Sequence, residues 1–188
     1  MAKLARAVAS DAGFTVIEIM VYVALVSVVL IIVAGIFGSM YRVQTSVVGG
    51  TAAAESAQVV SKSVESGVRN ATAVSLQSLG SDQFVLARTA GSGSSANWQC
   101  DAWYYDAAKK EVRFAYGASA IAAPTAAQLA TWQLLSGGIL PTNGSGIFSL
   151  AGSRLSLVFN AKSTNTTVVS VQTSVATEAG SWVSSPCF

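Results

Sequence analysis

The sequence predicts an α+β protein in which one long N-terminal helix is followed by an antiparallel β-sheet domain. Three observations support this fold class: an apolar run over residues 19–38, a one-sided helical pattern that continues to about Asn70, and alternating strand-like segments in residues 71–188. The chain has 188 residues, which is enough for one ordinary domain and an appendage but too few for two full cores. Its composition is 52% apolar and only 11% charged, which is unusual for a freely soluble protein.

The first apolar run is long enough to cross a membrane. No residue in 19–38 is charged, and a helix of about 20 apolar residues spans roughly 30 Å, the thickness of the hydrocarbon core. Lys3, Arg6 and the initiator amine precede the run, whereas the first basic residue after it is Arg42. Because basic flanks are retained on the cytoplasmic side, we expect the N-terminus in the cytoplasm and the chain beyond about Tyr41 outside it.

One acidic residue, Glu18, stands at the start of this run. A carboxylate in a membrane helix costs about 3 kcal/mol at the bilayer centre and less near an interface, and a helix that serves only as an anchor gains nothing from it. A cleaved secretory signal fits poorly, because its apolar region is only about 7 to 15 residues long and ends at a small-residue cleavage site. Glu18 is therefore a candidate functional residue.

The residues around Glu18 carry a family resemblance. The hexapeptide GFTVIE, residues 13–18, has a short basic leader before it and an apolar helix after it, and it resembles the type III signal of type IV pilins and type II secretion pseudopilins. The resemblance implies that a prepilin peptidase cuts between Gly13 and Phe14 and then N-methylates Phe14. It also implies a pilin-like fold, in which the first half of the long helix spans the membrane and the second half packs on an antiparallel sheet.

Glu18 has two candidate partners once Phe14 becomes the N-terminus. The two residues are one helical turn apart, about 6 Å along the axis, so Glu18 can pair with the amine of its own chain. The resemblance implies a second use, in which the acid of an incoming subunit meets the amine of a subunit already in the filament. Because an unpaired buried charge is heavily penalised, only the register that joins the two charges would be tolerated. The sequence leaves both pairings open.

The segment after the apolar run has the pattern of an amphipathic helix. Apolar residues recur at spacings of mostly three and four, at Val43, Val47, Ala54, Ala57, Val60, Val64 and Val68. Such a stripe needs a sheet to cover it. We therefore expect a cytoplasmic leader peptide at 1–13, a transmembrane and assembly helix at 14–41, its amphipathic continuation at 42–70, and an extracytoplasmic β-rich head at 71–188.

The head is expected to contain several strands and one short helix. The candidate strands cover residues 83–88, 98–105, 111–116, 147–150, 154–160 and 167–176. Residues 106–111 are typical of a hairpin turn, and residues 91–95 and 141–146 are typical of loops. Pro124 begins a pattern that predicts a short helix ended by Gly137 and Gly138.

The two cysteines, Cys100 and Cys187, both fall in the part of the chain expected outside the cytoplasm. Extracytoplasmic compartments are oxidising, so a cysteine pair there is more often bridged than free. We therefore predict a disulfide that ties the last residues to a central strand. Disulfides of the pilin family often close a shorter C-terminal loop, so this bridge would depart from the family pattern.

The composition argues against an enzyme. The chain has no histidine, which excludes catalytic triads that need one and zinc sites that depend on histidine. Its nine acidic residues are dispersed, and no phosphate-binding glycine loop is present. We expect no cofactor and no metal. The net charge is +2 and the basic residues are scattered, whereas nucleic-acid-binding proteins carry a basic face or stripe.

The expected function is that of a structural subunit, a minor pilin or a pseudopilin. The resemblance implies storage in the cytoplasmic membrane as a single-pass protein and later assembly into a type IV pilus or pseudopilus. Its partners would be prepilin peptidase, other pilins or pseudopilins, and membrane lipid around the N-terminal helix. Two alternatives stay open: a signal-anchored extracytoplasmic binding or adhesion module, and a DNA-capturing tip pilin.

Overall fold

The computed structural model describes residues 13, 15–90, 97–144, 146–163, 168–177 and 187–188. Residue contacts divide the chain into two compact units, Met1–Gln44 and Thr45–Phe188. Phe14 and residues 1–12 of the expected leader lie outside the described residues, as do the loop predicted at 91–95 and the first residue of the strand predicted at 167–176.

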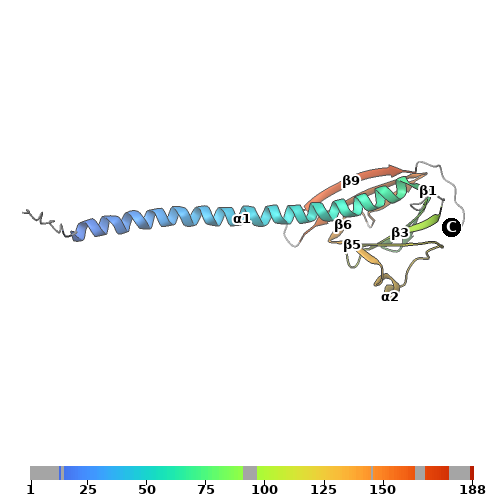
Figure 1. Cartoon of the computed structure of the whole chain (residues 1–188), viewed down its shortest axis with the longest axis horizontal. Coiled ribbons are helices and arrows are strands. Elements are labelled where there is room, and N and C mark those ends of the chain that lie inside the picture. The colour runs from blue at the N-terminus through green and yellow to red at the C-terminus, as the bar shows by residue number, and fades with distance from the viewer. Residues whose placement is uncertain (1–12, 14, 91–96, 145, 164–167, 178–186) are drawn as a thin grey trace, which may run out of the picture. The chain divides into compact units, whose positions relative to one another are not determined.

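The long helix predicted at the N-terminus is present as α1, Val16–Arg69 (Figure 1). In the first unit its large apolar side chains are exposed on all sides, and the helix is long and apolar enough to cross a membrane. The Ser27 hydroxyl donates to the carbonyl of Val23 at 2.7 Å, and the Ser39 hydroxyl donates to the carbonyl of Ile36 at 2.8 Å. Because hydrocarbon offers no water to polar groups, these internal bonds suit a helix surrounded by lipid.

In the second unit α1 buries one face. The buried positions are Gly49, Ala53, Ala57, Val60, Val64 and Val68, which recur every three or four residues as the pattern predicts. The start of the predicted stripe is wrong: Val43 and Val47 are 62% and 61% exposed, and Ala53 rather than Ala54 is buried. The buried face of α1 begins only at Gly49, so the earlier positions of the predicted stripe have nothing in the described head to pack against.

The first sheet is a five-stranded antiparallel meander whose spatial order follows the chain. It consists of β1 (Ala71–Leu79), β2 (Asp82–Ala90), β3 (Trp98–Asp106), β4 (Glu111–Gly117) and β5 (Gln133–Gly137). The predicted hairpin turn is confirmed, because β3 and β4 pair from Asp106 opposite Glu111 onward.

The second sheet is centred on β8. Its strands are β6 (Ile139–Pro141), β7 (Phe148–Ala151), β8 (Arg154–Lys162) and β9 (Val168–Ala176). β8 pairs antiparallel with all three of the others. The loop predicted at 141–146 falls between β6 and β7, although Pro141 itself ends β6 and Ser145 lies outside the described residues.

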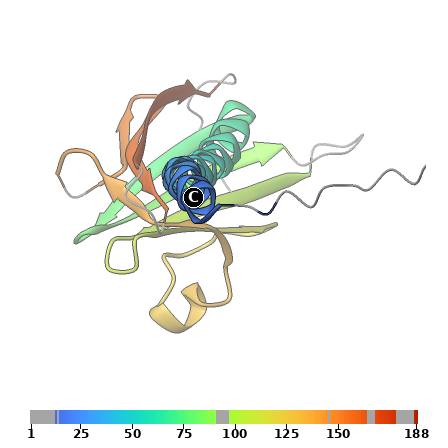
Figure 2. The same ribbon diagram turned by 90° about the vertical axis from the view of Figure 1, so that its left-hand side faces the viewer.

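The main core lies where the second half of α1 meets both sheets (Figure 2). The helix contributes its alanine and valine stripe, the first sheet contributes Trp103 and Tyr105, and the second contributes Leu155, Leu157 and Phe159. These three β8 residues are fully buried, which confirms the predicted alternation along that strand. A second cluster covers the opposite face of the first sheet and includes Phe84, Tyr104, Leu129 and Cys187.

The helix predicted after Pro124 is wrong beyond its first turn. Only α2, Ala126–Leu129, is helical, and it begins at a capping box made by Thr125 and Gln128. The following residues form β5, which pairs with β4, so non-local pairing overrides the local helical pattern. Gly138 then bends the chain towards the second sheet with a φ of +71°, and a β-carbon there would lie against the carbonyl of Lys162. The strands β1, β5 and β6 were not predicted.

Candidate functional site

The first turn of α1 positions the predicted acidic residue. Thr15 directly precedes the helix, and its Oγ1 accepts a hydrogen bond from the Glu18 amide at 3.3 Å. The Thr15 carbonyl accepts further bonds from the amides of Glu18 and Ile19 at 3.1 and 3.3 Å. Thr15 therefore satisfies amides that the start of a helix leaves without intrahelical partners. Glu18 is the acidic residue of this first turn, where the helix dipole favours a negative charge.

The Glu18 carboxylate has a local partner one turn further along α1. The Tyr22 hydroxyl donates to Glu18 Oε1 at 3.5 Å, which is at the limit of hydrogen-bond distance. Both side chains are exposed, and Glu18 is the only charged residue between Val16 and Tyr41. In lipid or in a bundle of apolar helices, such a carboxylate strongly favours a cationic partner. The arrangement is therefore chemically suited to receive an amine.

Gly13 lies two residues before Thr15 and is exposed, and among the described residues that are not its chain neighbours none has a heavy atom within 4 Å of the position of a β-carbon. The resemblance to prepilins implies a scissile bond after this residue. Phe14, the residue expected to carry the methyl group, lies outside the described residues, so the pairing of Glu18 with its own Phe14 stays a hypothesis.

Sequence reasoning missed Thr15 and Tyr22 as neighbours of Glu18. A usable signal was present for each. Thr15 and Glu18 have the spacing of a helix-start capping pair, and Tyr22 follows Glu18 by four residues, the spacing that brings side chains together on one helix face.

The predicted disulfide is confirmed in the head. Cys100 and Cys187 are bridged, with their Cα atoms 5.5 Å apart and 87 positions of sequence between them. Both cysteines are buried in the second cluster. Cys100 lies on the face of β3 that turns away from α1, because alternate residues of a strand face opposite sides and Trp103 faces the helix. The bridge thus holds Cys187 against the face of the first sheet that turns away from α1.

The acidic side chains near the hairpin turns of the head form hydrogen bonds and ion pairs with neighbouring residues. Asp82 accepts hydrogen bonds from the Tyr104 hydroxyl at 2.8 Å and from the Ala107 amide at 2.9 Å. Burial, together with the hydrogen bond to Asp82 and its negative charge, raises the pKa of Tyr104 to about 12. Nearby, Asp106 and Glu111 form ion pairs with Lys109. Within the described ranges, no group of three or more potential ligands could hold a metal ion.

Asp101 is a further acidic residue that points towards the end of α1. It accepts hydrogen bonds from Gln99 Nε2 at 2.9 Å and Thr89 Oγ1 at 3.2 Å. Burial raises the pKa of its carboxyl group, and these two hydrogen bonds oppose the shift. Asp101 and Asp106 both belong to β3. They lie on opposite faces of β3, because they are five residues apart along one strand.

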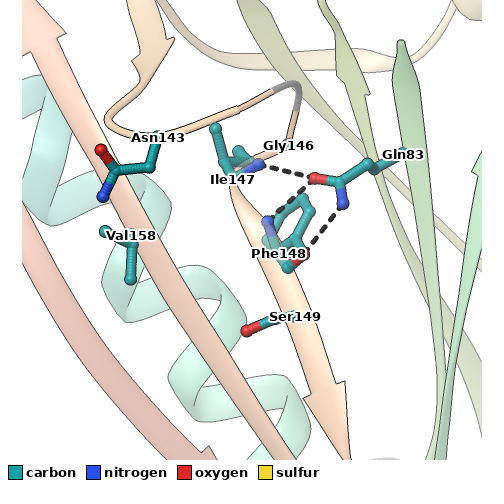
Figure 3. Close-up of a pocket in the computed structure, with 7 residues that line it drawn as sticks. All are labelled: Gln83, Asn143, Gly146, Ile147, Phe148, Ser149 and Val158. Carbon is teal, nitrogen blue, oxygen red and sulfur yellow. Dashed lines mark hydrogen bonds between the residues drawn. The ribbon is translucent and has the colours of Figure 1, made fainter.

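A cavity of about 370 Å³ lies beside the start of β7 (Figure 3). Its most buried polar group is the Gln83 amide, which is already bonded to the backbone. Gln83 Oε1 accepts from the amides of Ile147 and Phe148 at 2.6 and 2.9 Å, and Gln83 Nε2 donates to the Phe148 carbonyl at 2.9 Å. The remaining lining residues are Asn143, Gly146, Ser149 and Val158, so none of the residues around the cavity is charged.

Gln83 is therefore a structural residue that joins β2 to the second sheet. Sequence reasoning placed it in a strand but gave no sign of this role, since its partners are more than 60 positions away. The cavity supplies no convergent free polar groups of the kind that orient a small-molecule ligand.

Comparison with known proteins found no family model, no curated protein and no solved structure that matches this chain.

Proposed function

We propose that this protein is a structural subunit of a type IV pilus or of a secretion pseudopilus, processed by a prepilin peptidase between Gly13 and Phe14. The observation that carries the proposal is the position of Glu18. It is the only acid in the membrane-length part of α1, it lies in the first helical turn, and it follows the expected cleavage site by five residues.

The proposed mechanism follows from charge. Cleavage after Gly13 would create a positive amine on Phe14 at the start of the helix. Glu18 would then neutralise an amine, and in a filament that amine would belong to a neighbouring subunit. The exposed apolar surface of α1 would be covered by lipid before assembly and by neighbouring helices afterwards. The head, closed by its own core and disulfide, would form part of the filament surface.

A minor subunit fits the head better than a major one. Disulfides of the family that the sequence resembles often close a short C-terminal loop, whereas this bridge spans 87 positions and reaches a central strand. This part of the proposal predicts a low copy number, measured as the ratio of this chain to the most abundant subunit in sheared filaments.

Processing can be tested directly. The full chain should be expressed with and without a prepilin peptidase, and the N-terminus of the membrane-bound product determined by mass spectrometry. We expect a chain that begins with N-methylated Phe14 only when the peptidase is present, and no cleavage of a Gly13→Val variant. An intact Met1 in the presence of an active peptidase, or cleavage elsewhere, would instead support a signal-anchored module.

The role of Glu18 can be separated from processing. Glu18→Val should be cut normally yet be recovered in sheared filaments at a level reduced roughly tenfold or more, because the neighbouring amine loses its counter-charge. Glu18→Asp is the matched control, since it keeps the charge, and it should be recovered better than Glu18→Val. Normal recovery of the valine variant would contradict the assembly role.

A further inference from the structure

The chain between β6 and β7 carries an asparagine that is directly followed by a glycine, Asn143 and Gly144. Both residues are exposed and neither belongs to a strand. Asparagine is one of the thermolabile residue types, because the backbone nitrogen of the next residue can attack its side-chain amide. The pair is therefore a candidate site of spontaneous chemical modification in the folded protein.

The reaction needs only these two residues and water. The Gly144 nitrogen loses its proton to a solvent base and bonds to Cγ of Asn143. The bond between Cγ and Nδ2 breaks, ammonia leaves, and a cyclic succinimide remains. Water then opens the ring at either carbonyl. Breaking the bond from the Gly144 nitrogen to Cγ gives aspartate, whereas breaking its bond to the main-chain carbonyl carbon of residue 143 gives isoaspartate.

The structure leaves both reacting groups free. Within the described part of the chain, no hydrogen bond involves the Asn143 side chain or the Gly144 amide, and Figure 3 shows Asn143 apart from the bonds that Gln83 makes. Gly144 has no side chain beside the attacking nitrogen. Among the described residues that are not its chain neighbours, none has a heavy atom within 4 Å of the position of a β-carbon there. The approach of the nitrogen to Cγ is thus open.

The other asparagines that the structure describes lack this combination. The Asn70 side chain donates to a carbonyl in the last turn of α1 at 3.0 Å, and the next residue, Ala71, is fully buried. Asn160 lies inside β8, which pairs with β6 on one side and β9 on the other. Asn97 is exposed, but the large side chain of Trp98 stands beside the nitrogen that would attack. Reaction at Asn70 or Asn160 requires the secondary structure to open locally.

The modification would change the charge of the cavity beside β7. Asn143 lines this cavity, and none of the lining residues is charged. Either product places a carboxylate there and lowers the net charge of the chain, which is +2, by one unit. Isoaspartate also lengthens the main chain of the loop by one atom. Because Gln83 holds the amides of Ile147 and Phe148, the change in the backbone should stop before β7.

We propose that Asn143 is a self-modifying site of the folded head, which converts through a succinimide to aspartate and isoaspartate and gives the uncharged cavity a carboxylate. Ammonia is lost to the solvent, so asparagine is not regenerated and the converted fraction rises with the age of the chain. This inference goes beyond the proposed function and does not depend on processing of the N-terminus.

The test incubates the purified full chain in detergent micelles at neutral and at mildly alkaline pH. Peptide mass spectrometry follows the exchange of NH for O at each asparagine, and chromatography separates isoaspartate from aspartate. We expect Asn143 to convert faster than Asn70 and Asn160 by about tenfold or more, because those two must wait for local opening. The rate at Asn143 should rise with pH, because a base must remove the proton of the Gly144 nitrogen.

The products distinguish the proposed route from simple hydrolysis. Direct attack of water on the side-chain amide gives aspartate alone, whereas the succinimide also gives isoaspartate. The proposal would be overturned by aspartate without isoaspartate at residue 143, or by conversion of Asn143 no faster than that of Asn70 and Asn160. Asn143→Gln should remove the isoaspartate at this position, because the longer side chain would have to close a larger ring. Asn70→Gln is the matched control and should leave the isoaspartate at residue 143 unchanged.

Unfolding and a product variant test the part played by the fold. In denaturant the rates at Asn70 and Asn160 should rise by about tenfold or more, whereas the rate at Asn143 should change much less, because the fold protects only the first two. An equally large rise at Asn143 would show that the folded head protects it and would overturn the proposal. Asn143→Asp stands in for one product, and its Tm should stay within about 2 °C of the native value. An unfolded Asn143→Asp head would also contradict the proposal, which requires the folded head to hold the carboxylate.

Discussion

Replacing Gly67 with alanine should destabilise the head, because Trp103 occupies the space of the new methyl group. A β-carbon on Gly67 would lie 2.3 Å from Cη2 and 2.6 Å from Cζ2 of Trp103. Carbon atoms in good contact are about 3.5–4.0 Å apart, so one of the two residues must move by about 1 Å. Gly67 thus allows α1 to approach β3 closely, which no other residue type at this position would permit.

Trp103 has little freedom to move away. Its side chain is 1% exposed, its Nε1 donates to Ser63 Oγ at 2.9 Å, and its ring centroid lies 5.4 Å from that of Phe114. Overpacking of this kind costs about 1–3 kcal/mol, whereas the better helix propensity of alanine returns about 1 kcal/mol. Because Trp103 is held on several sides, we expect a net loss of about 2 kcal/mol in the free energy of unfolding, or a Tm lower by about 5 °C.

Thermal unfolding of the full chain in detergent micelles, followed by circular dichroism in the aromatic region, measures this effect. Gly137→Ala is the matched control, because no other heavy atom lies within 4 Å of its β-carbon position. In a Trp103→Leu background, which lacks the indole ring, Gly67→Ala should cost much less. If Gly67→Ala instead raises the Tm of the otherwise native chain, helix propensity dominates and the packing argument is wrong.

Three further predictions concern the disulfide, the bridging glutamine and the buried tyrosine. Replacing both Cys100 and Cys187 with alanine should lower the free energy of unfolding by about 4 kcal/mol, because the bridge closes a loop of 87 positions; equal denaturant midpoints for the variant and the oxidised native chain would contradict this. Gln83→Leu should cost about 2 kcal/mol in denaturant unfolding, because it leaves the amides of Ile147 and Phe148 without their acceptor, whereas Gln77→Leu, at an exposed position of β1, should cost little. The pKa of Tyr104 is raised to about 12, so the folded state holds this proton more tightly than the unfolded state, and stability should fall as the pH rises from about 10 to 12. Asp82→Asn should lower the pKa of Tyr104, measured by tyrosinate absorbance, and an unchanged alkaline titration would refute the assignment.

Local pattern was sufficient for much of the fold. The apolar run and the valine stripe predicted α1 to within one residue of its C-terminal end, because helix periodicity is a property of neighbouring residues. The strands with clear alternation, such as β8, were predicted for the same reason. The capping pair of Thr15 and Glu18 was visible in the sequence, although only the structure drew attention to it.

The errors fall where distant residues decide the outcome. Residues 133–137 have a helical pattern but form β5, because the free edge of β4 offers them a hydrogen-bonding partner. Gln83 looks like any polar residue of a strand, yet it is buried and bonded to the start of β7. Neither result depends on local propensity, so no window of neighbouring sequence could reveal it.

The sequence by itself determined the apolar helix, the single acid at its start, the absence of histidine and the two cysteines beyond the expected span, because these are matters of composition and spacing. Only the tertiary structure decided that Cys100 lies on the face of β3 away from α1, where Cys187 meets it, and that Gly67 receives the Trp103 ring. The physical reason is that both contacts depend on the order and register of the strands, which arise from pairing between segments far apart in the chain.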